Sequence, residues 1–172
     1  MAKVKIVLDA DVILHFSKVD RLVFLTEIFP EYDYVVLSKV YDEIKEKKIK
    51  DYLDRCVLLL KTITIVQFNP TGEMYREYAI LSSKRGVGES ACMAYCKYTN
   101  NVIGSSNLKD IENYCKDNEI TYLTTIDFLY YAVKKRKMTK LEAENFILEV
   151  RDKGSILPEN INFATYIPSS QM

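Results

Sequence analysis

Residues 5–14, KIVLDADVIL, decide how the rest of the chain is interpreted. The apolar run Ile6–Leu8 is typical of a buried strand, and the apolar residues that follow Asp11 suit the start of a helix. In open parallel α/β sheets, ligands bind at the edge where the strands end. Asp9 directly follows the strand, so its carboxylate is a candidate site residue. Asp11 has the simpler alternative of a helix cap.

Length and composition set broad limits on fold and function. The 172 residues fit one domain with a buried core. The 24 Lys and Arg equal the 24 Asp and Glu in number, so no overall basic field indicates nucleic acid, and a polyanion would need local patches. The four cysteines lack zinc-ligand spacing and stand in apolar helical surroundings, which is typical of reduced packing residues in a cytoplasmic protein. We expect neither export nor membrane insertion, since no apolar run is long enough.

Strand-like and helix-like segments alternate along the chain. Short apolar runs after the first one predict further strands at residues 34–37, 62–66, 102–105 and 120–123. Amphipathic stretches predict helices at residues 11–29 with a break near 17, then at 40–48, 51–60, 71–83, 89–98, 107–117, 125–137 and 139–153. This alternation predicts an α/β protein, a three-layer α/β/α sandwich around a mainly parallel sheet.

The end of the chain is treated separately from the domain. We assign residues 1–157 to the domain and 158–172 to a C-terminal tail, with no linker or internal repeat before it. Four apolar side chains of the tail are expected to dock on the domain: Ile161, Phe163, Tyr166 and Ile167. The last four residues are expected to fray.

Several polar side chains follow strands or open helices, and a parallel sheet would gather them at one edge. They are Asp9, Glu43, Glu89 and Asn107. Glu89 shares a helical face with Cys92 and Cys96, an unusual place for an acid, although interaction with the helix dipole is an alternative explanation. Carboxylates that are forced together raise one another's pKa unless a hard cation sits among them. A Mg²⁺ or Mn²⁺ site for phosphodiester chemistry is the natural solution.

Four motifs, in this order along the chain, resemble those of a PIN-domain ribonuclease. They are IVLDADVIL at 6–14, LSKVYDEI at 37–44, GESA at 88–91, and TTIDFLYYA at 124–132 followed by KMT at 137–139. The resemblance covers about residues 4–157. It implies an α/β/α sandwich and a metal-dependent endoribonuclease that cuts single-stranded RNA. It also allows the toxin of a toxin–antitoxin pair, with a protein antitoxin or a second copy of the chain as partner.

The resemblance assigns roles to individual positions. Asp9, Glu43 and Glu89 match the three acids that would hold the metal. At the fourth position the family usually has Asp, whereas this chain has Asn107, which could bind metal through its amide oxygen at one less negative charge. Asp110, one turn later, is the alternative fourth ligand, although a capping box explains it equally well.

Two further acids have supporting roles in this assignment. Asp11 stands where the family often has Asn, and it would orient a ligand rather than bind the metal. Asp127 would act from the second shell or serve only as a helix N-terminal carboxylate. The implied mechanism is in-line attack on the phosphodiester by metal-activated water. His15, the only histidine, is a candidate general base, but a lone histidine in an apolar helix is more often packed in the core.

Basic segments offer candidate RNA contacts. These residues are Lys84 and Arg85, before the Glu89 turn, and the run beside Tyr130 and Tyr131, which is Lys134, Lys135, Arg136 and Lys137. A solvated helix end is the alternative for that run, and we interpret the basic residues of 45–50 as a solvated face.

Two other functions compete with the ribonuclease. One is a PIN-like module that lost catalysis at residues 105–107 and binds RNA or a protein partner. The other is a small-molecule or nucleotide-binding protein, which the sequence disfavours because GVG at 86–88 is too short for a phosphate-binding loop.

Overall fold

The computed structural model describes residues 3–172. Its strands are β1 (Lys5–Leu8), β2 (Asp33–Leu37), β3 (Ile63–Val66), β4 (Val102–Gly104) and β5 (Tyr122–Leu123). Its helices are α1 (Ala10–Lys18), α2 (Leu22–Ile28), α3 (Ser38–Glu43), α4 (Lys47–Leu58), α5 (Gly72–Ser82), α6 (Val87–Thr99), α7 (Leu108–Asp117), α8 (Thr125–Lys134) and α9 (Lys140–Asp152).

The five strands form one parallel sheet in the order β3-β2-β1-β4-β5. β1 lies at the centre, where Val7 pairs with Val35 on one side and with Ile103 on the other. Ile6, Val7 and Leu8 are fully buried, as expected for a central strand with both faces covered. The predicted α/β class with a central parallel sheet is confirmed.

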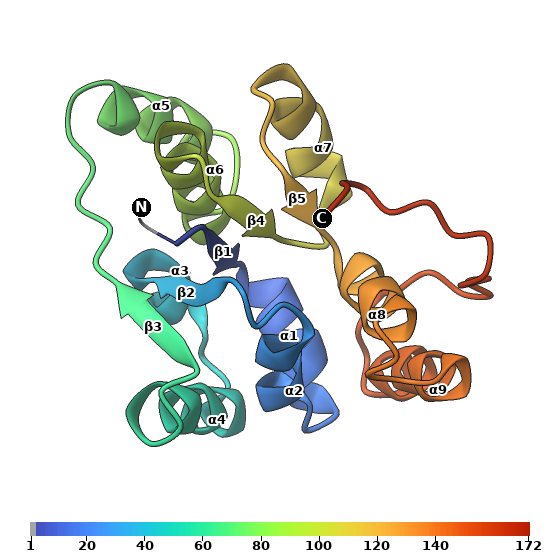
Figure 1. Ribbon diagram of the computed structural model, residues 1–172. Coiled ribbons are helices and arrows are strands. Elements are labelled where there is room, and N and C mark those ends of the chain that lie inside the picture. The colour runs from blue at the N-terminus through green and yellow to red at the C-terminus, as the bar shows by residue number, and fades with distance from the viewer. Residues whose placement is uncertain (1–2) are drawn as a thin grey trace.

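Helices cover both faces of the sheet (Figure 1). Helices α3, α5, α6 and α7 pack together on one face, and α1, α2, α4, α8 and α9 pack on the other. This arrangement fits the predicted three-layer sandwich. Aromatic side chains fill the core between α1, α8 and α9. The Phe16 ring lies 6.1 Å from Phe128 and 4.8 Å from Phe146, measured between ring centroids.

The break expected near residue 17 in the helix 11–29 is present, and it follows Lys18, where Asp20 takes a positive φ of 55°. A boundary that differs from the sequence prediction lies at the end of α3. The predicted helix 40–48 ends at Glu43, because the next residue, Ile44, is extended and buried in the core. As a result Lys47 begins a separate helix, α4.

The C-terminal tail is held more firmly than predicted. Phe163 is buried, whereas Ile167 is 83% exposed and does not dock. The fraying expected for the last four residues is wrong, because Ser170 Oγ accepts a hydrogen bond from the Tyr122 amide (3.1 Å) and Met172 N donates to the Tyr131 hydroxyl (3.0 Å). The tail therefore covers part of the edge strand β5.

Two other expectations concern the cysteines and the membrane. Cys56, Cys92, Cys96 and Cys115 are free and buried, as predicted for packing residues. Within residues 3–172, no helix combines the length and the apolar character needed to cross a membrane.

Candidate functional site

The site begins where β1 ends. Asp9 follows Leu8, and its amide extends the pairing with β4 by donating to Gly104 O (2.8 Å). The Asp9 carboxylate caps α1, since Oδ1 accepts from Ala10 N (2.8 Å), and Oδ2 accepts a longer bond from Ser105 Oγ (3.2 Å). Its side chain is only 6% exposed. The pairing of β1 with β4 thus places a buried carboxylate beside residues 105–107, as the sequence predicted.

Asp11 is more than a helix-start residue. Its Oδ1 accepts from its neighbour Val12 N (2.6 Å), and its Oδ2 accepts from Ser106 N (2.9 Å) across the β1–β4 edge. The N-cap of α1 is Asp9, so the capping alternative for Asp11 is wrong. Asp11 instead ties the first turn of α1 to the segment after β4.

Glu89 reaches the same edge from the first turn of α6, and it is 7% exposed. Its Oε1 accepts from Asn107 Nδ2 (2.8 Å), and the same nitrogen donates to Asp110 Oδ2 (2.8 Å). Asn107 makes no side-chain cap on α7, so the alternative capping box with Asp110 is not formed. Arg85 Nε lies 3.9 Å from Asp110 Oδ1, is buried and has no hydrogen-bond partner in the described chain.

The electrostatics of these acids indicate crowding. Burial, and then the neighbouring charges of Asp11 and Glu89, raise the pKa of Asp9 well above its usual range. Burial also raises the pKa of Asp11, against the hydrogen bond from Ser106. Burial and the Asp110 charge raise the pKa of Glu89 to about 7. The charges of Asp11 and Glu89 act on Asp9, and those of Asp110 and Asp11 act on Glu89, so these carboxylates lie within electrostatic reach of one another.

Glu43 contacts the backbone next to Glu89 rather than the carboxylate itself. The side chain is exposed, and its Oε1 accepts from the amide of Gly88 at the start of α6 (2.8 Å). Gly88 permits this approach, because a Cβ there would overlap the Glu43 carboxylate and lie 3.2 Å from Val40 Cα. Among residues 3–172, no three His, Cys, Asp or Glu side chains are arranged so that they could hold a metal ion as they stand.

Asp127, the other predicted supporting acid, has a structural role. It is fully buried and forms the capping box of α8 with Thr124. Its Oδ2 accepts from Thr124 N (2.7 Å) and Oγ1 (2.8 Å), and its Oδ1 accepts from Tyr166 OH (2.8 Å) and Ser169 N (2.9 Å). These partners belong to α8 and the tail, so Asp127 anchors the tail rather than supporting Asp9.

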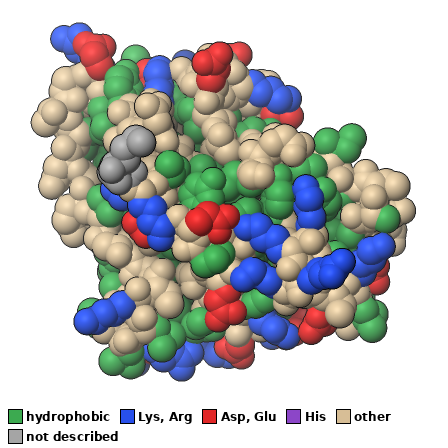
Figure 2. Space-filling model, viewed as in Figure 1, with side chains coloured by type: hydrophobic (Ala, Val, Ile, Leu, Met, Phe, Trp, Pro, Cys, Tyr) green, Lys and Arg blue, Asp and Glu red, His purple; other side chains and the backbone are tan. Residues whose placement is uncertain are grey.

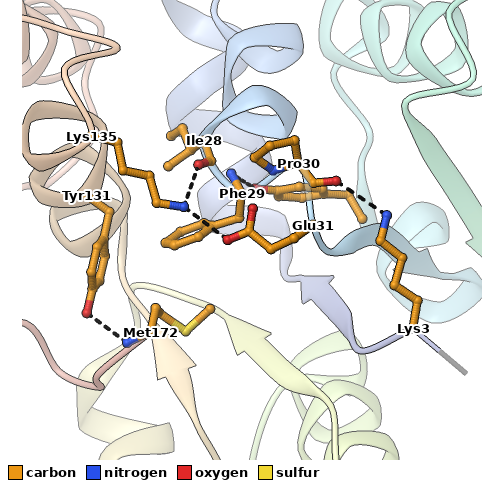
Figure 3. Close-up of polar contacts among 9 residues, drawn as sticks. Lys3, Ile28, Phe29, Pro30, Glu31, Tyr131, Lys135 and Met172 are labelled. Atoms are coloured by element: carbon orange, nitrogen blue, oxygen red, sulfur yellow. Dashed lines mark hydrogen bonds and ion pairs between the residues drawn. The ribbon is translucent and has the colours of Figure 1, made fainter. Parts of the chain in front are cut away.

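The two predicted basic segments lie at opposite edges of the sheet. Residues 84–85 precede α6 at the edge where the strands end. Residues 134–137 lie at the far end of α8, about 15 Å along the helix from its start at that edge. There Lys135 Nζ contacts Ile28 O and Glu31 Oε1, both at 3.1 Å, just before β2 begins (Figure 3). Residues 134–137 are therefore too far from Asp9 to contact a phosphate group bound there.

A third basic group, Lys45, Lys47 and Lys48, follows Glu43 in the chain. Because α3 ends at Glu43, Lys45 lies between α3 and α4, and Lys47 and Lys48 begin α4. All three side chains are exposed, as the interpretation of a solvated face predicted. Elsewhere, on the face in Figure 2, basic side chains lie among acidic ones and form no continuous field.

Nothing in the sequence indicated a hydrogen-bonded chain of side chains that leads to the acids. His15 Nδ1 lies 2.8 Å from Thr125 Oγ1, which lies 2.8 Å from Ser106 Oγ. These residues come from α1, α8 and the segment after β4, so only the fold brings them together. Comparison of the chain with protein-family models, with curated proteins and with solved structures gives no match.

Proposed function

We propose that this chain is a PIN-like, Mg²⁺- or Mn²⁺-dependent endoribonuclease that hydrolyses single-stranded RNA. The observation that supports it most is the pair of nearly buried carboxylates of Asp9, directly after β1, and Glu89, in the first turn of α6. The charge of Glu89 contributes to the raised pKa of Asp9, and the pKa of Glu89 is itself raised by burial and by the charges of Asp110 and Asp11. Acids placed this way cost stability unless a cation joins them. Such a cost is typical of a functional site.

The donor set suits a hard divalent cation. Every candidate ligand is a carboxylate or amide oxygen, the type that Mg²⁺ and Mn²⁺ prefer. Glu89 uses Oε1 for Asn107, which leaves Oε2 for a cation, and the bond from Ser105 to Asp9 Oδ2 is long at 3.2 Å. Asp9 and Glu89 would hold the ion, with Glu43 approaching from the other side of the α6 turn.

A divalent ion bound there would supply charge neutralisation and would lower the pKa of an attacking water. The chain's own groups do the rest. Asp11, held by Ser106 N, would accept a hydrogen bond from that water and orient it. Arg85, next to Asp110, supplies a cation for the phosphate, and Lys84 adds charge beside it.

In its most specific form, the proposal is a cytoplasmic toxin-type ribonuclease that acts with a protein antitoxin or as a homodimer. The resemblance in the four sequence motifs supports this form. Co-expression with a candidate antitoxin, and mass measurement of the chain in solution, would test it.

One observation favours the competing function, a weakened module that binds RNA or protein. The Asn107 amide donates to both Glu89 and Asp110, so a neutral group already offsets part of the charge that a cation would neutralise. An Asn107→Asp substitution separates the two functions. It should raise the rate of RNA cleavage if the Asn107 amide is what weakens metal binding.

The direct test is cleavage of labelled single-stranded RNA with Mn²⁺ by the wild type, by Asp9→Asn and by Asp33→Asn. Asp33 is a matched control, an exposed acid at the start of β2, where it pairs with Lys3. We expect metal-dependent cleavage by the wild type and by Asp33→Asn, and a loss of about 100-fold or more in Asp9→Asn. Equal activity in all three proteins would exclude Asp9 as a metal ligand, and no activity in any of them with Mn²⁺ left unbound would exclude the enzyme.

A further inference from the structure

A buried histidine lies at the end of a hydrogen-bonded chain that leads to the acids. His15 is 6% exposed in α1, and its Nδ1 lies 2.8 Å from the hydroxyl oxygen of Thr125, which is fully buried. Thr125 contacts Ser106 twice, through Oγ1–Oγ (2.8 Å) and through its amide, which donates to Ser106 Oγ (2.9 Å). The amide of Ser106 in turn donates to Asp11 Oδ2 (2.9 Å).

We assign the direction of the chain with His15 Nδ1 as the final acceptor. Ser106 Oγ accepts from the Thr125 amide and donates its own proton to Thr125 Oγ1. The Thr125 hydroxyl then donates to His15 Nδ1. In this arrangement His15 is neutral with its proton on Nε2, and burial favours the neutral ring, because it lowers the pKa of His15 to about 4.

We propose that His15 is a positioning residue, which fixes the Asp11 carboxylate through Thr125 and Ser106. Ser106 is held twice, by its hydroxyl to Thr125 and by its amide to Asp11. Without an acceptor at residue 15, the buried Thr125 hydroxyl loses its partner, which is costly, and it turns back toward Ser106. The Ser106 hydroxyl then loses the acceptor that fixes its side chain, and the segment whose amide holds Asp11 is held less firmly.

The role of the chain in catalysis rests on the proposed function, but the positioning itself does not. Asp11 is a charged neighbour of Asp9, so its position affects a cation held by Asp9. Removing the hydrogen bonds that orient the groups around a metal site typically changes metal affinity or activity by about 10- to 100-fold. A measurement at Ser106 reports on positioning without any metal, and a measurement of Mn²⁺ affinity reports on its consequence. The two readouts separate a failure of this inference from a failure of the proposed enzyme.

The choice of variants follows from the role of His15 Nδ1 as a hydrogen-bond acceptor. In His15→Asn the amide oxygen can occupy the place of Nδ1, because both stand at the same number of bonds from Cβ. His15→Phe keeps the ring and removes the acceptor. Phe16→Leu is the matched control for lost packing, since Phe16 is fully buried in the same helix and contacts Phe128 and Phe146 instead of the chain.

The first readout is exchange of the Ser106 amide proton by NMR in metal-free protein. We expect exchange about tenfold faster in His15→Phe than in the wild type, and near-normal exchange in His15→Asn and Phe16→Leu. Unchanged exchange in His15→Phe, or equally fast exchange in Phe16→Leu at the same melting temperature, would overturn the inference.

The second readout is the dissociation constant for Mn²⁺. We expect His15→Phe to bind about tenfold more weakly and His15→Asn to recover most of the loss. If the wild type binds Mn²⁺ and His15→Phe binds it equally well, the positioning role is wrong. If the wild type binds no Mn²⁺, the proposed enzyme fails, and the exchange data alone decide whether His15 positions Ser106.

Discussion

Asp9 and Asp127 are both buried acids that follow a strand and begin a helix, yet their surroundings differ. Asp127 receives four hydrogen bonds, two at each oxygen. Asp9 receives two, one of them long, and has Asp11 and Glu89 as charged neighbours. A buried carboxylate with a full set of donors stabilises a fold, whereas one that lacks them and faces other acids costs stability. The difference distinguishes an anchor from a candidate cation ligand.

The largest effect on stability is expected at the anchor. In Asp127→Asn, either orientation of the amide points an NH₂ group at a backbone N–H, that of Thr124 or that of Ser169. We expect a loss of about 2–4 kcal/mol in the free energy of unfolding. Urea titration measures it, with Asp33→Asn as the control that should change by less than about 0.5 kcal/mol. If Asp127→Asn leaves the free energy of unfolding unchanged, the tail is not held as described.

A change of the opposite sign, a gain in stability, is expected at the proposed cation site. Asp9→Asn removes a buried charge from beside Asp11 and Glu89 while keeping an oxygen for the Ala10 amide. In metal-free protein at pH 8 we expect the variant to be more stable by about 1–3 kcal/mol. Thermal or urea unfolding in EDTA measures the gain. Destabilisation by Asp9→Asn would make Asp9 a structural acid like Asp127.

The pH dependence should separate the two acids further. Glu89 has its pKa raised from 4.5 to about 7, and that of Asp9 is raised too, so between these values the folded state binds more protons than the unfolded state. Stability of the metal-free protein should therefore fall as the pH rises from about 4.5 to 7. The fall should be smaller in Asp9→Asn, as unfolding at a series of pH values would reveal. An equal slope in both proteins would argue against the crowded cluster.

The smallest effect is expected where Glu43 meets α6. Gly88→Ala should displace the Glu43 carboxylate and lower stability by about 1–2 kcal/mol, because Val40 Cα limits the space. Gly86→Ala is the control, since a Cβ there meets no atom within 4 Å and its φ is −57°. Equal unfolding free energies for the two variants would mean that Glu43 is not docked on α6.

The same contrast explains what could be predicted from sequence. The positions of Asp9 and Glu89 follow from local patterns, an apolar run before an acid and an acid on an apolar helical stripe. The role of Asp127 at the start of α8 was one of the two alternatives from the sequence, and the capping box with Thr124 agrees with it. Its anchoring of the tail could not be predicted from local patterns, because Tyr166 and Ser169 lie about 40 residues further on. The misplacement of residues 134–137 has a similar cause, since the length of α8 takes them to the opposite edge of the sheet.

The hydrogen-bonded chain from His15 to Ser106 could not be predicted from the sequence for the same physical reason. His15 and Thr125 are 110 residues apart, and the sequence around His15 is that of an ordinary apolar helix. The sheet order, with β1 between β2 and β4, brings α1 next to the segment after β4. Local patterns thus give the strands, most helices and the acids, while hydrogen-bond partners need the tertiary fold.

The most direct test of the difference between Asp9 and Asp127 is titration calorimetry of the metal-free protein with Mn²⁺ at pH 7.5. The wild type and the control Asp33→Asn should bind one or two ions, and Asp9→Asn should bind at least about tenfold more weakly. Identical binding curves for the wild type and Asp9→Asn, or no heat of binding in any of the three proteins, would contradict a cation site at the end of β1.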